Sequence, residues 1–130
     1  MTIAAWCLLA AFVLIYWPRV AAYKATRAQE GRYDILEPRT QQQRLTGKAL
    51  RAQSAHQNML EAFPAFAAAV LLNHILPSDP AWRDGLALAF VIARTVYIPA
   101  YLGDWGYRRT AIWAIGFFAT LGLLLLPALA

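Results

Sequence analysis

The chain has 130 residues, of which 60% are hydrophobic and only 15% are charged, with a formal net charge of +5. This length allows one domain, and the mean hydropathy of +0.42 is too high for an ordinary soluble fold. The same apolar bias argues against nucleic acid as a partner, because loops between membrane helices explain the basic excess better. The composition therefore predicts an all-α integral membrane protein.

Four stretches are long and apolar enough to cross a bilayer as helices. About 20 helical residues span a hydrocarbon core of about 30 Å. Uncharged runs at 3–17, 86–93 and 111–130 are apolar all round instead of on one face. We expect an up-and-down bundle of four transmembrane helices that forms a single domain, residues 1–130. The predicted spans are residues 2–23, 50–76, 81–102 and 109–127.

A polar loop at residues 24–49 is the only long hydrophilic segment. It holds six Lys and Arg residues, and the link at 103–109 holds two more, whereas both chain ends and the connection between the second and third spans together hold only Arg83. By the positive-inside rule, the two basic loops are cytoplasmic and both termini lie away from the cytoplasm. We expect the protein in the cytoplasmic (inner) membrane.

Polar residues at helical spacing run into the second span. Spacings of three and four residues place this set on one face of a helix: Arg51, Ser54, Asn58 and Glu61. A charged group inside a span costs about 2.5–3.5 kcal/mol and normally faces the bundle interior or a water-filled cavity. Glu61 is therefore expected to face the interior of the bundle.

The third span repeats this pattern. Its stripe consists of Arg94, Tyr97, Tyr101 and Asp104. A rise of about 1.5 Å per residue, counted from the turn at 77–80, places Glu61 and Arg94 at similar depth, so the two stripes are expected to face each other. Two interpretations follow: a structural ion-pair and hydrogen-bond knot of Glu61, Asn58 and Arg94, or a ligand site.

Three other polar residues receive no chemical role. His56 is off the stripe and near one membrane surface, where we expect it to pack or cap. Asn73 and His74 lie near the opposite surface, where polar side chains cost little. No metal-binding or nucleotide-binding motif is present, so no metal site is predicted.

These residues resemble a known family, MAPEG, the membrane-associated proteins in eicosanoid and glutathione metabolism, and suggest a bacterial-type member. The resemblance covers the second to fourth spans in register and the first span by hydropathy. It rests on Arg51-x-x-x-Ala55-His56-x-Asn58-x-x-Glu61-x-Phe63-Pro64, on Ala93-Arg94-x-x-Tyr97-x-x-x-Tyr101, and on the pair Arg109-Thr110.

The resemblance implies four-helix subunits assembled as a homotrimer. It also implies glutathione as a co-substrate, bound between subunits near the cytoplasmic side, with membrane lipids and a hydrophobic small-molecule substrate as further partners. The residues that match the glutathione-site pattern are Arg51, Asn58, Glu61, Arg94, Tyr97 and Tyr101. In catalytic members an arginine at the start of the fourth helix stabilises the glutathione thiolate. Here that residue is Arg109 or Arg108, depending on a gap in the link, and we expect Arg109, which adjoins Thr110.

Two positions depart from the family pattern. Members with well-developed glutathione sites tend to carry further arginines where this chain has Ser54 and Gln57. Each such arginine would contribute a charge-assisted contact worth about 1.5–3 kcal/mol. Two functions are therefore considered. One is a membrane-bound glutathione transferase or peroxidase-like protein that activates the thiol for attack on a hydrophobic electrophile. The alternative is a non-catalytic lipid-binding or scaffold membrane trimer of the same fold.

Overall fold

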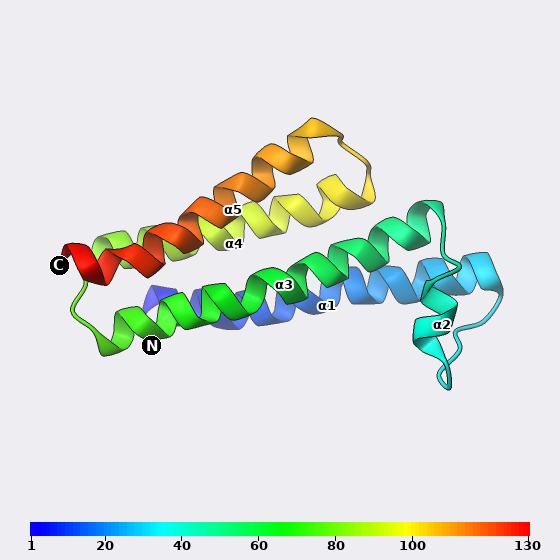
Figure 1. Ribbon diagram of the computed structural model, residues 1–130, viewed down its shortest axis with the longest axis horizontal. Coiled ribbons are helices and arrows are strands. Elements are labelled where there is room, and N and C mark those ends of the chain that lie inside the picture. The colour runs from blue at the N-terminus through cyan, green and yellow to red at the C-terminus, as the bar shows by residue number, and fades with distance from the viewer.

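The computed structural model describes all 130 residues and contains only helices (Figure 1). The elements are α1 (Ile3–Glu30), α2 (Pro38–Gln42), α3 (Gly47–Ile75), α4 (Pro80–Leu102), α5 (Tyr107–Leu125) and the 3-10 helix η1 (Leu126–Leu129). α1 packs mainly on α3, and α4 packs mainly on α5. The long helices run up and down, so both termini lie at the end of the bundle opposite to α2 (Figure 1).

Three of the long helices are apolar enough to cross a membrane. They are α1, α4, and α5 continued through η1. α3 is 29 residues long, but polar side chains at Asn58, Glu61, Asn73 and His74 lower the hydropathy of its apolar half. The prediction of an all-helical membrane fold is therefore confirmed as three candidate spans plus a fourth helix.

The helices extend into the segment that the sequence predicts as a loop, residues 24–49. α1 continues into it and ends at Gly31, which adopts a left-handed φ of 81° and donates its N–H to the Arg27 carbonyl. Lys, Arg, Glu, Gln and Ala are all good helix formers. The charged residues after the apolar span therefore mark where the membrane ends, but α1 continues through them. The connection between α1 and α3 is thus shorter than predicted, residues 31–46, and it contains α2.

Gln41 organises this connection. Its side chain is 3% exposed; Oε1 accepts the Asp34 N–H at 2.9 Å, and Nε2 donates to the Arg32 carbonyl at 2.8 Å. The N–H groups of Glu37 and Leu36 donate to the Asp34 carboxylate at 3.0 and 2.9 Å, and these bonds lower the pKa of Asp34. The connection is therefore an ordered segment, and it lies at the end of the bundle opposite to the two termini (Figure 1).

Small side chains and one aromatic pair build the core. Buried alanines let the helix backbones approach closely: Ala4, Ala11, Ala69, Ala87 and Ala119. Phe66 of α3 stacks on Phe90 of α4, with ring centroids 3.9 Å apart and planes 7° from parallel. This stack joins the two helix pairs, and the polar residues of α3 and α4 described below lie about one to three turns from it, toward the end of the bundle that carries α2.

Asn73, for which no role is expected from the sequence, is a buried hydrogen-bonding residue. It is 3% exposed, and its Nδ2 donates to the carbonyls of Ala69 at 2.8 Å and Leu123 at 2.7 Å. Pro127 has no N–H to donate to the Leu123 carbonyl four residues earlier. Asn73 supplies that missing donor from a neighbouring helix, as membrane interiors require.

Replacing Asn73 by alanine is expected to lower the free energy of unfolding by about 1–3 kcal/mol, because the Leu123 carbonyl then lacks a donor in a water-poor interior. Thermal or denaturant unfolding of the detergent-solubilised protein measures this change. Pro127→Ala restores a backbone N–H at that position, so Asn73→Ala should cost less in the Pro127→Ala background. An equal cost in both backgrounds would contradict this role of Asn73.

Candidate functional site

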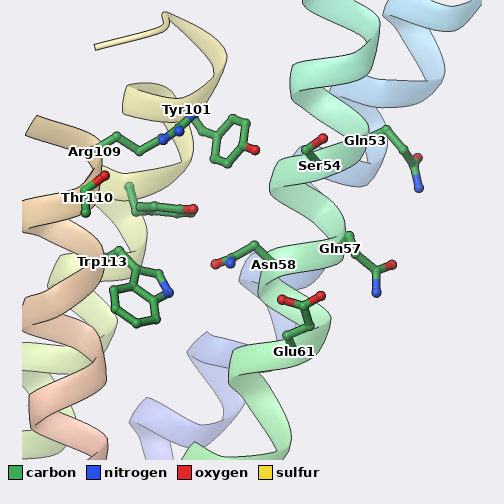
Figure 2. A pocket seen from close by; sticks show the side chains of 10 residues that line it. Gln53, Ser54, Gln57, Asn58, Glu61, Tyr101, Arg109, Thr110 and Trp113 are labelled. Carbon is green, nitrogen blue, oxygen red and sulfur yellow. The ribbon is translucent and has the colours of Figure 1, made fainter. Parts of the chain in front are cut away.

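A polar cavity of about 530 Å³ opens between α3 on one side and α4 with α5 on the other (Figure 2). Its lining residues are Gln53, Ser54, Gln57, Asn58, Glu61, Tyr97, Tyr101, Arg109, Thr110 and Trp113. The stripes of α3 and α4 thus face a common space, and the first turns of α5 close it. Of the predicted site residues, Arg51, Arg94 and Arg108 are not part of this lining.

Arg94 lies behind the wall of the polar cavity, is only 1% exposed, and contributes to the lining of the second cavity described below. One of its Nη atoms donates to Asn58 Oδ1 at 2.6 Å, and its Nε donates to Met59 Sδ at 3.1 Å. Its Cζ also lies 4.3 Å from the centre of the Tyr97 ring, in a cation–π contact. These contacts hold Asn58 and Tyr97 in place and satisfy a buried charge that has no carboxylate partner.

Arg109 is the cation that lines the cavity. It is half-buried at the start of α5, and its Cζ lies 4.2 Å from the centre of the Tyr101 ring. The Tyr101 ring in turn meets the Tyr97 ring edge-on, with centroids 5.6 Å apart. The two tyrosine rings on the cavity wall therefore lie between Arg94 behind the wall and Arg109 on it, and each guanidinium group is held by a cation–π contact.

Arg108 and Arg51 lie elsewhere. Arg108 is exposed and contributes nothing to the cavity lining, although it is the direct neighbour of Arg109. Arg51 donates from Nε to the Leu102 carbonyl at 3.2 Å, at the C-terminal end of α4. That contact satisfies a carbonyl that has no partner within its helix, and the positive charge suits the helix end.

Glu61 is exposed within the single chain and makes neither a hydrogen bond nor an ion pair. The hydrogen-bonded link between Asn58 and Arg94 is thus formed, whereas Glu61 takes no part in it. An unpaired carboxylate on a cavity wall is available for a ligand or for a neighbouring subunit.

A second, mostly apolar cavity of about 310 Å³ continues from the first. The two share Asn58, Glu61 and Trp113. On its far side the second cavity is lined by exposed apolar residues of α5: Phe117, Leu121 and Leu124. A polar compartment and an apolar compartment therefore meet at a tryptophan, and the apolar one reaches the surface that a bilayer would cover.

Several residues that line the two cavities, or that support the residues lining them, are not predicted from the sequence. Trp113 lines both cavities, and a signal for it existed, because it follows Arg109 by four residues and so lies on the same helix face. Thr110 and Gln53 line the polar cavity, and Met59 accepts the Arg94 hydrogen bond. No local pattern marks Met59, since its role depends on which helix packs against α4.

Comparison with known proteins shows one relationship. A family model described as the MAPEG family matches residues 3–129. No curated protein matches the chain, and no solved structure does.

Proposed function

This chain belongs to the MAPEG family, and on that basis we propose that it is a membrane-bound protein of the glutathione transferase or peroxidase type. It activates the glutathione thiol for attack on a hydrophobic electrophile. One observation carries the proposal: the half-buried guanidinium of Arg109 lines a polar cavity that continues into an apolar one. A polar thiol and an apolar electrophile each find a matching compartment.

The polar cavity offers the groups that glutathione needs. Glutathione carries carboxylates, an ammonium group and a thiol. Glu61, which has no partner within the chain, suits the ammonium group, while the Ser54 hydroxyl and the tyrosine hydroxyls suit a carboxylate. The cavity volume of about 530 Å³ falls within the range of about 300–1,000 Å³ that is usual for small-molecule sites.

Arg109 supports the chemical step. A guanidinium stays protonated, so beside the thiol it stabilises the thiolate and increases its population at neutral pH, with the released proton passing to water. The thiolate sulfur forms a bond to an electrophilic carbon held in the apolar cavity, and the electron pair of the broken bond leaves with the departing group. Tyr101, in contact with Arg109, keeps the guanidinium in position.

We further propose a homotrimer in the cytoplasmic membrane, with both termini away from the cytoplasm and glutathione bound between subunits. The basic loops support this orientation. α1 presents exposed apolar side chains to lipid or to another subunit, among them Trp6, Phe12 and Val13. The unpaired Glu61 also suits a site that a ligand or a neighbouring subunit completes.

A glutathione titration of the detergent-solubilised protein tests the function. We expect heat of binding and the near-ultraviolet absorbance of a thiolate. S-methylglutathione, which has no ionisable thiol, should give the heat without the absorbance. The absence of both the heat of binding and the thiolate absorbance when glutathione is added would contradict the proposal.

Ser54→Arg is expected to tighten glutathione binding about tenfold or more, because a guanidinium on this cavity wall adds a charge-assisted bond worth about 1.5–3 kcal/mol. Calorimetric titration measures the affinity. Thr40→Arg adds the same charge at an exposed position of α2 outside the cavities and serves as the control. An equal gain in both variants would show a general effect of charge.

A non-catalytic lipid-binding or scaffold trimer is the second candidate. Ser54 and Gln57 favour it, because both are uncharged on a wall where an arginine would bind a glutathione carboxylate. This candidate predicts lipid that co-purifies with the protein and no turnover of any electrophile. Glutathione-dependent turnover would rule it out.

A further inference from the structure

A third cavity, of about 700 Å³, lies between α1, α2 and α3. Figure 2 shows the side chains of Gln53 and Gln57 directed away from α5, and both line this third cavity. The remaining lining includes two arginines, a tyrosine, a histidine and two more glutamines, and no carboxylate. Its polar groups are thus rich in donors, and its only formal charges are positive.

Arg19 is held in place without being neutralised. Its Nη donates to the Tyr33 hydroxyl at 2.7 Å, and its Cζ lies 5.4 Å from the centre of the Tyr33 ring. The Tyr33 ring packs on the Tyr23 ring at 5.2 Å. Because neither ion pair of the chain includes Arg19, most of its five N–H donors stay free for an anion.

Arg39 and His56 add to this arrangement from two other helices. Arg39 is an exposed residue of α2 and also takes no part in an ion pair. His56 Nδ1 lies 3.0 Å from the Ile15 carbonyl, so it carries the proton and donates it, which fixes the ring on the cavity wall. The hydrogen bonds of Gln41 hold the connection that contains α2, and α2 contributes Arg39 to the cavity lining.

From this geometry we propose that the third cavity binds the phosphate headgroup of an anionic phospholipid. Two unpaired guanidinium groups with surrounding amides match a phosphate, and basic pockets between membrane helices commonly hold anionic headgroups. The apolar neighbours indicate a lipid. Leu60 of α3 lines the cavity and is exposed. About one turn farther along α3, the Phe63 ring lies 6.1 Å from the Phe12 ring of α1, which lies 5.4 Å from the Tyr16 ring. These apolar side chains offer a surface on which the acyl chain of the lipid would lie.

The test uses the full chain in a neutral detergent, with phosphatidylglycerol, phosphatidylcholine or inorganic phosphate added separately. Native mass spectrometry measures bound lipid, and thermal unfolding measures protection. We expect phosphatidylglycerol to bind and to raise the unfolding midpoint, and the other two to do neither. Equal protection by inorganic phosphate would overturn the assignment to a lipid and identify free phosphate as the ligand. Equal binding of phosphatidylcholine, or no binding of phosphatidylglycerol, would overturn the proposal.

Matched variants locate the site. Arg19→Gln and Arg39→Gln should each weaken phosphatidylglycerol binding about tenfold or more. Arg32→Gln removes the same charge from the connection but lies outside the cavity, so it should bind as the unmodified protein does. Arg39 is exposed, so its variant tests the site even if Arg19→Gln does not fold. An equal loss in Arg32→Gln would overturn the proposal. Glutathione titration of the same variants is a separate readout, so failure here leaves the proposed function intact.

Discussion

Arg109→Ala is expected to abolish thiolate formation by bound glutathione and to lower kcat/KM with a hydrophobic electrophile by about 100-fold or more, the usual effect of removing a group that stabilises developing negative charge. Arg109 is the cation on the wall of the polar cavity, and the alanine variant leaves no replacement there. The near-ultraviolet absorbance of the thiolate and the turnover rate measure the two effects. The rate of the variant should recover as pH rises, because the unassisted thiol then ionises by itself.

Arg108→Ala is the matched control for this experiment. It removes the same charge from the adjacent, exposed position, so glutathione ionisation and turnover should be nearly unchanged. Arg109→Lys keeps the charge but loses the planar fork, and it should retain part of the activity. A loss in Arg108→Ala together with an active Arg109→Ala would assign the catalytic role to Arg108 instead.

Arg94→Met and Arg94→Ala are expected to separate two contributions of the buried Arg94 side chain: its hydrogen bond to Asn58 and the volume that it fills. Methionine preserves most of the volume but cannot donate to Asn58, so glutathione should bind about tenfold more weakly once Asn58 and Tyr97 lose their support. Alanine leaves a cavity as well, which should lower the free energy of unfolding by about 2–5 kcal/mol relative to the methionine variant. Calorimetric titration and denaturant unfolding measure these quantities.

Arg51→Met is the control for Arg94. It also removes a guanidinium from the polar stripe, but this one contacts the Leu102 carbonyl outside the cavity. We expect a loss of stability of about 0.5–1.5 kcal/mol and unchanged affinity for glutathione. Weakened binding equal to that of Arg94→Met would place Arg51 in the site, as the family resemblance implies.

Much of the fold was predictable because lipid imposes simple rules. Long uncharged runs must be helical in a bilayer, and the runs at 3–17, 86–93 and 111–130 indeed lie in α1, in α4, and in α5 with η1. The prediction was least accurate in residues 24–49, where α1 and α3 continue and α2 forms. Hydropathy reports where the membrane ends, whereas the helix continues until a residue such as Gly31 interrupts it.

Asn73 and Glu61 show why the polar residues were harder to interpret. Both are polar side chains on the apolar half of α3. Asn73 is buried and bonds the carbonyl that Pro127 leaves free, whereas Glu61 has no partner in the chain. A position in the sequence gives the depth of a polar group, but its partner belongs to another helix.

By itself, the sequence determined the membrane class and two polar stripes, because apolar length and helical spacing depend only on the residues of one segment. Only the tertiary structure decided which arginines face the cavity. Consecutive residues differ by about 100° around a helix, so the start of α5 at Tyr107 turns Arg109 toward Tyr101 and leaves Arg108 exposed. Packing of α3 against α4 likewise places Arg94 behind the wall.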